Sequence, residues 1–228
     1  MKKRLLICSG LFILVCTFAA DFYWYGPGSF NGIFVTPKFG DPSNYATFSS
    51  TGNLRLYGNA TVWEDIRIAD GQIRAGATAP SLATFVGGGL RTYQFLASAV
   101  NEVEFTIQMP HSWKIGSTIS PHIHWAPTST DTNRVVWGFE YSWANIGSTF
   151  PSSTTVYTTN YAGGTAWKHT LSDFPDITNT NSFSSAIVCR LFRLGTATED
   201  DYPDPAAFVE FDIHYEIDSL GTDQEYVK

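Results

Sequence analysis

Residues 207–218, with the sequence AFVEFDIHYEID, constrain the fold more strongly than any other part of the chain. Four acidic residues and one histidine alternate with apolar residues there, and the apolar set is Ala207, Val209, Phe211, Ile213, Tyr215 and Ile217. This period-two pattern is typical of a β-strand with one face in a core and one face turned outward. The carboxylates of the outward face repel one another unless water, a cation or a basic partner meets them.

The rest of the chain also favours strands. Aromatic residues make up 15% of the 228 residues, and 19 glycines and 11 prolines supply turns. No sustained helical stripe follows the first twenty residues. Further strand-like runs lie at 53–57, 60–68, 101–109, 119–125, 135–143, 154–158, 166–171 and 184–193. We therefore predict an all-β fold, an antiparallel β-sandwich of jelly-roll-like type with an extended N-terminal arm. Asp70-Gly71 predicts a hairpin turn.

The N-terminus has the features of a secretory signal peptide. Three basic residues precede an apolar run over 5–18, and small residues follow at 19 and 20. The apolar run is shorter than the roughly 20 residues that a membrane span needs. We expect residues 1–19 to be a signal peptide. The mature protein would then be secreted or held at the cell surface without a stable membrane span, and its formal charge would fall from −7 to −10.

Two further regions are predicted after the signal peptide. Residues 20–52 are rich in aromatic residues, glycine and proline without regular alternation, which indicates an extended arm, and 53–228 form the β-sandwich domain. We expect the arm to contact a neighbouring subunit through Phe22, Tyr23, Trp24, Tyr25, Phe30 and Phe34. The acidic side chains of Glu210, Asp212 and Glu216 are candidates for the same interface.

Composition excludes some classes of function. No cluster of Lys and Arg follows the N-terminus, which argues against nucleic-acid binding. Cys189 is the single cysteine beyond the signal peptide and lies in an apolar run, so we expect a buried, inert thiol. The acidic residues 199–201, with Asp204, are either a calcium site or a solvated loop. We identify no catalytic residues.

Three histidines are candidate ligands of a divalent metal. His122 and His124 are two residues apart on a predicted strand, so both side chains project from one face. If that strand neighbours 207–218, His214 completes a three-histidine site, with Asp212, Glu210 or Glu216 as an oxygen ligand. The alternative is a polar face on which imidazoles pair with acids or lie in a subunit interface.

Gly116, five further residues and His122-Ile-His124 resemble the opening of the first cupin motif. The glutamate of that motif is replaced by Thr128 and Ser129, and the second motif is missing. A cupin-like metalloenzyme is therefore the weakest of the functional hypotheses.

A longer series of phrases resembles uncharacterised proteins encoded in tailed-phage and environmental viral genomes. The phrases are VWEDI at 62–66, QMPHSWKIG at 108–116, PHIHW at 121–125, WGFEYSWA at 137–144 and FDIHYEIDSLG at 211–221. This resemblance implies a virion structural or fibre-like role without catalytic residues. The signal peptide departs from that group and suggests an exported relative.

The leading functional hypothesis is a non-enzymatic extracellular structural protein. It would assemble into a homo-oligomer or polymer, as a fibre, appendage or virion-type subunit, through the arm and the polar sheet face. The alternative is a carbohydrate-binding β-sandwich module that uses exposed aromatic side chains.

Overall fold

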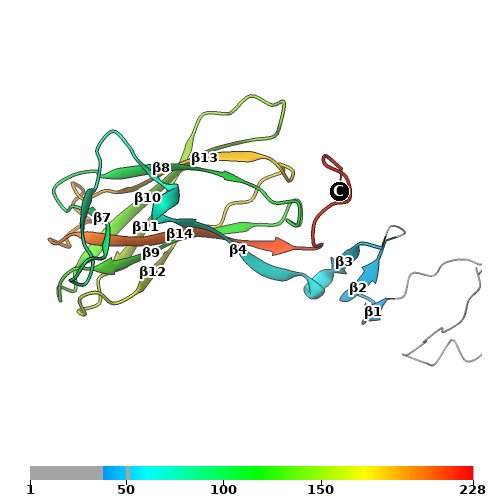
Figure 1. The fold of residues 1–228 in the computed structure, drawn as a ribbon, viewed down its shortest axis with the longest axis horizontal. Helices are drawn as coiled ribbons and strands as arrows, with labels where there is room; N and C mark the ends of the chain where they lie inside the picture. The colour runs from blue at the N-terminus through cyan, green and yellow to red at the C-terminus, as the bar shows by residue number, and fades with distance from the viewer. Residues whose placement is uncertain (1–37, 50–51, 228) are drawn as a thin grey trace, which may run out of the picture. The chain divides into compact units, whose positions relative to one another are not determined.

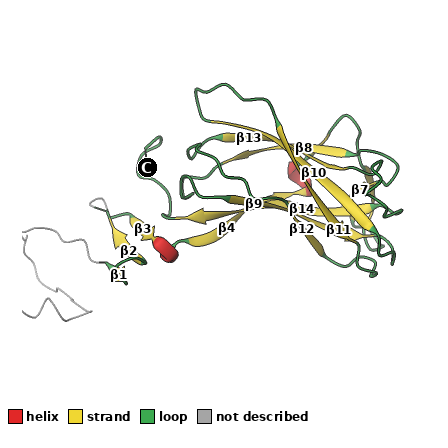
Figure 2. Ribbon diagram, turned by 180° about the vertical axis from the view of Figure 1, so that it is seen from behind, coloured by secondary structure: helices red, strands yellow, loops and turns green. Residues whose placement is uncertain are grey.

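Two antiparallel β-sheets packed against each other form the body of the protein (Figure 1). This computed structural model describes residues 38–49 and 52–227, all within one unit, Thr36–Lys228. Helix in the described part is limited to the 3-10 turns η1 (Gly58–Ala60) and η2 (Asp70–Gln72) (Figure 2). Within these residues, no helix has the length and apolar character needed to cross a membrane.

The strands of the two main sheets alternate along the chain. The five-stranded sheet has the order β11 (Thr154–Tyr161), β10 (Arg134–Ala144), β13 (Ala186–Arg193), β8 (Glu102–Gln108) and β5 (Arg74–Ala75). The second sheet has the order β12 (Thr170–Asp173), β9 (Ile119–Pro127), β14 (Ala206–Ile217), β7 (Arg91–Phe95) and β6 (Ser81–Thr84), and β4 (Val62–Ala69) also pairs with β14. Between β4 and β14 the chain changes sheet at every connection except the β6–β7 and β10–β11 hairpins. The predicted jelly-roll-like antiparallel sandwich is confirmed.

Aromatic side chains from both sheets fill the core. The rings of Phe105 and Phe139, from the five-stranded sheet, lie 5.1 and 4.8 Å from the ring of Phe211 on β14. Trp125 of β9 and Trp137 of β10 are fully buried and contact each other at 5.9 Å. Alternate residues of β8, β9 and β10 therefore form the core, because every second side chain of each strand points between the sheets.

The predicted inward face of β14 is wrong at its N-terminal end. Phe208 pairs with Trp125 and Glu210 pairs with His124, so Val209 is an extra residue in a β-bulge. The bulge reverses the alternation, and Ala206 and Phe208 therefore belong to the core in place of Ala207 and Val209. From Phe211 onward the predicted face is right.

The hairpin turn predicted at Asp70-Gly71 is also wrong. The η2 turn connects β4, which pairs with β14, to β5, which pairs with β8 in the other sheet. The chain crosses between sheets there and does not fold back. Gly71 has no positive φ angle, which the two-residue type I′ turn would require.

A small third sheet includes the described part of the predicted arm. The central strand β2 (Tyr45–Phe48) pairs with β1 (Phe39–Gly40) on one side and with β3 (Leu54–Tyr57) on the other. The predicted boundary between residues 52 and 53 therefore falls between two paired strands. The predicted signal peptide and the aromatic residues from Phe22 to Phe34 lie outside the described residues.

A buried arginine fixes the loop between β13 and β14. All five N–H donors of Arg193 have acceptors, namely both carboxylate oxygens of Asp200 and the carbonyl oxygens of Phe95, Tyr202 and Asp204. Neither side chain of the Arg193–Asp200 ion pair is exposed. Asp201 forms an ion pair with Arg134. The candidate calcium loop thus uses two of its carboxylates to bind arginines.

Replacing Arg193 by Met should destabilise the protein by about 3–5 kcal/mol, because it leaves the buried Asp200 carboxylate without a counter-charge. Urea unfolding measures this change. Arg134→Met is the matched control, since it removes an arginine from a partly exposed ion pair in the same loop region. The control should change the unfolding free energy far less, and equal losses from the two variants would contradict the assigned role of Arg193.

Cys189 is buried, as predicted, and burial raises the pKa of its thiol. Because the thiolate is the reactive form, a thiol-specific reagent should not modify Cys189 in the native protein. The count of reactive thiols should then be equal in native wild-type protein and Cys189→Ser. It should differ by one per chain in denaturant. A difference between the native proteins would show that the thiol is accessible.

Candidate functional site

The register between β9 and β14 brings the predicted metal ligands together. His122 lies opposite Asp212, His124 opposite Glu210, and Ser120 opposite His214. These residues alternate with core residues on each strand, so they share the outer face of the six-stranded sheet. The two strands run side by side between β12 and β4 (Figure 1).

His122, Asp212 and His214 form the first group of candidate ligands. One donor atom from each side chain lies within 4.8 Å of the donor atoms of the other two. The His122 and His214 rings are 4.1 Å apart, with an angle of 68° between their planes. His214 Nε2 is held by Asp65 Oδ1 at 2.8 Å, from the neighbouring strand β4.

His122 is buried although it lies on the outer face. Neither of its ring nitrogens has a hydrogen-bond partner among the described residues, and Asp212 Oδ1 also lacks one. Asp173 Oδ1 lies 3.5 Å from His122 Nδ1, which is long for a hydrogen bond. Burial lowers the pKa of His122 and raises the pKa of Asp212. Both side chains are therefore desolvated, and burial disfavours the charged form of each.

The three histidines do not form one site, contrary to our expectation. His124 belongs to a second group with Glu210 and Asp212. Its Nε2 lies 3.2 Å from Asp212 Oδ2, and its Nδ1 lies 2.7 Å from His169 Nε2. Asp212 is thus shared by the two groups, while Glu216 belongs to neither of them.

Three residues of this face were missed from the sequence. Asp65 contacts His214, Asp173 lies next to His122, and His169 contacts His124. Asp65 is the neighbour of the inward-facing Ile66 in β4, and successive side chains of a strand point to opposite faces, so Asp65 lies on the outer face. That signal is present in the sequence, but it does not show which strand β4 pairs with.

Two acidic residues of β14 are neutralised within the chain. Glu210 forms an ion pair with Arg67, and Glu216 forms one with Lys114. Asp212 is nearly inaccessible to solvent. Of the carboxylates that were candidates for a subunit interface, Glu210 and Glu216 therefore already have partners on neighbouring segments, and Asp212 is buried.

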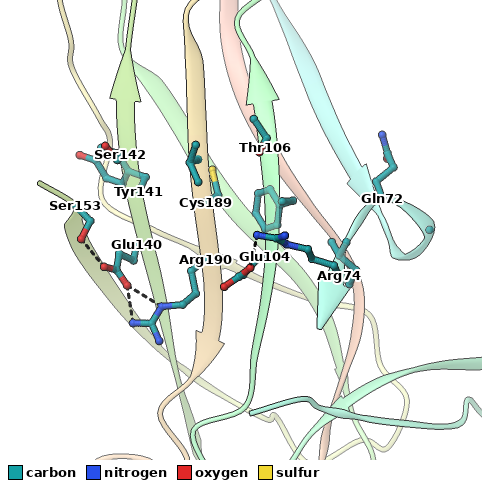
Figure 3. A pocket seen from close by; sticks show the side chains of 14 residues that line it. Gln72, Arg74, Glu104, Thr106, Glu140, Tyr141, Ser142, Ser153, Cys189 and Arg190 are labelled. Atoms are coloured by element: carbon teal, nitrogen blue, oxygen red, sulfur yellow. Dashed lines mark hydrogen bonds and ion pairs between the residues drawn. The ribbon is translucent and has the colours of Figure 1, made fainter. Parts of the chain in front are cut away.

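A second candidate site is a groove of about 700 Å³ on the outer face of the five-stranded sheet (Figure 3). Side chains of β8, β13 and β10 line it, and η2 and β5 border it at one side. Its lining includes Glu104, Thr106, Glu140, Ser142, Val188 and Arg190. This groove was not identified from the sequence.

The charges in the groove are paired with one another. Arg190 forms ion pairs with Glu140 at 2.6 Å and Glu102 at 2.5 Å, and Arg74 forms one with Glu104 at 2.6 Å. The Ser153 hydroxyl also donates to Glu140, and these hydrogen bonds, with the Arg190 charge, lower the pKa of Glu140. The groove therefore presents polar groups of both signs but no uncompensated arginine.

No model of a known protein family matches the chain, and no curated protein matches it either. Among solved structures it is similar to "CBM35 from Cellvibrio japonicus Abf62", with 10% sequence identity and a TM-score of 0.37. The similarity covers 66% of this chain and 92% of that chain. At this TM-score the likeness carries no argument about function.

Proposed function

We propose that this protein is a non-catalytic extracellular β-sandwich that binds a neutral carbohydrate in the groove on its five-stranded sheet. The observation that carries the proposal is the row of paired charges across the groove floor. Arg74 lies opposite Glu104, Glu104 opposite Arg190, and Arg190 opposite Glu140. The cross-strand register thus sets hydrogen-bond donors and acceptors side by side at fixed spacing.

The chemistry of this row favours a polyhydroxylated ligand. Each hydroxyl group of a sugar can donate to a carboxylate and accept from a guanidinium group. Thr106 and Ser142 add hydroxyl groups, and Val188 adds an apolar surface for the C–H groups of a sugar ring. Because the charges are already paired, a neutral ligand can bind without competing for a counter-ion. The volume is in the usual range for a small-molecule site.

Calorimetry with a panel of neutral oligosaccharides tests this proposal. Val188, which is 47% exposed in the groove, is replaced by Arg to fill the space. The matched control is Leu82→Arg on edge strand β6, where the side chain is 44% exposed. Val188→Arg should weaken binding by about tenfold or more, a loss of roughly 1.4 kcal/mol, and Leu82→Arg should leave it unchanged.

Three outcomes would reject the carbohydrate groove. They are no binding across the panel, equal binding by the two variants, and loss of binding only in Leu82→Arg. Thermal unfolding of each variant shows whether the substitution preserves the fold.

A specific apolar patch favours self-association as a second function. Phe39 and Phe48 of the small sheet contact each other edge to face at 6.4 Å, and both are exposed. Phe48 and Leu220 line one shallow cavity, and Leu220 is 82% exposed. Contiguous exposed apolar side chains of this kind are typical of protein contact sites. Phe39 and Phe48 belong to the predicted arm, for which we expect a neighbouring subunit as partner, so a second copy is the occupant we propose.

Light scattering coupled to size-exclusion chromatography tests the self-association. If the patch joins two copies, Leu220→Asp should shift the protein toward monomer, because burying a carboxylate in an apolar contact is unfavourable. Leu90→Asp is the control, since Leu90 is exposed on the turn between β6 and β7. A monomeric wild-type protein, or an unchanged oligomer in Leu220→Asp, would reject this second function.

A further inference from the structure

We propose that His122, Asp212 and His214 bind a divalent transition-metal ion. This site lies on the outer face of the six-stranded sheet, whereas the carbohydrate groove lies on the other sheet. The metal proposal therefore does not depend on the proposed function.

The three donors are close to metal-binding geometry. Their candidate ligand atoms all lie within 4.8 Å of one another. Bonds of 2.0–2.1 Å at tetrahedral angles place ligand atoms about 3.4 Å apart, so small side-chain rotations would be sufficient. His122 and Asp212 come from directly paired positions on β9 and β14, which keeps their backbones at a fixed separation.

Among the described residues, the imidazole of His122 has no hydrogen-bond partner, which points to a bound ligand separately from the distances between the donor atoms. His122 is only 6% exposed, and both ring nitrogens lack hydrogen-bond partners in the described structure. Such a group costs free energy unless something binds it. His122 and His214 line a cavity of about 410 Å³ together with Trp63 and Asp173. An ion in this position would satisfy the imidazole and leave coordination sites open toward the cavity.

Neighbouring side chains support the cation. His214 Nε2 contacts Asp65, as a ligating histidine commonly contacts a carboxylate through its second nitrogen. The carboxylates of Asp65, Asp173 and Asp212 surround the two imidazoles. Arg67 lies opposite Asp212 but forms an ion pair with Glu210, so its positive charge competes less with a metal ion for the Asp212 carboxylate.

The donor set selects the class of ion. Two imidazoles and one carboxylate suit Zn²⁺ and the neighbouring first-row ions, whereas Ca²⁺ and Mg²⁺ prefer oxygen ligands. Three protein ligands are fewer than a closed structural zinc site uses. We therefore expect water or another small ligand to complete the coordination on the cavity side.

The experiment titrates Zn²⁺ into chelator-treated full-length protein by calorimetry and repeats the titration with Co²⁺ by visible absorption. We expect one ion per chain and a Co²⁺ spectrum that reports nitrogen and oxygen ligands. His214→Ala should weaken binding by at least about tenfold, and Asp65→Ala by about 10–100-fold through the loss of the second-nitrogen contact. The His214 side chain is 41% exposed, so its removal leaves little cavity.

His169→Ala is the matched control, because His169 contacts His124 of the second group and is not a ligand in the proposed site. It should bind Zn²⁺ as the wild-type protein does. The proposal is overturned if wild-type protein binds no ion, or if His214→Ala binds normally. Loss of binding in His169→Ala with retention in His214→Ala would also overturn it, since the ion would then occupy the second group. Failure of the carbohydrate titration would leave these results unaffected.

Discussion

The antiparallel register between β9 and β14 is the constraint on which the rest of the structure depends. On the inner face it sets Phe211 opposite Ile123, in the middle of the aromatic core. On the outer face the same register sets His122 opposite Asp212. Because the side-chain period of a strand is two, a shift by one residue would move the histidines into the core and the aromatic rings into solvent. Core packing therefore fixes the geometry of the outer site.

The two outer faces carry similar charge ladders with different consequences. Across the five-stranded sheet, Arg74, Glu104, Arg190 and Glu140 occupy successive paired positions. Across the other sheet, the corresponding ladder is Asp173, His122, Asp212 and Arg67. An arginine keeps its charge when it is partly buried, so the first ladder is satisfied by its own ion pairs. At the centre of the second ladder, both ring nitrogens of His122 lack hydrogen-bond partners among the described residues, so this ladder is not satisfied by its own contacts. This difference is why we assign a neutral ligand to one face and a metal ion to the other.

The period of the longer strands could largely be predicted from the sequence, but the neighbours of each strand could not. Alternation identified the inward residues of β8, β9 and β10 because burial acts on every second residue. It failed at Val209, where a bulge adds one residue without a local sequence signal. It also failed at Asp70-Gly71, because the path of the chain there depends on two distant pairings, of β4 with β14 and of β5 with β8. The groove was missed for the same reason, since its charges meet only across four strands, β5, β8, β13 and β10.

The division of the histidines into two groups has a simple geometric cause. Residues i and i+2 of one strand are separated by roughly 7 Å, whereas directly opposed residues of paired strands have Cβ atoms about 4.5–5.5 Å apart. His122 is therefore closer to side chains across the β9–β14 pair than to His124, with which it shares a strand. The predicted pair of ligands, His122 and His124, is separated by the longer of these two distances, the one along the strand. The shorter one joins His122 to Asp212, and it became available only when the pairing of β9 with β14 was known.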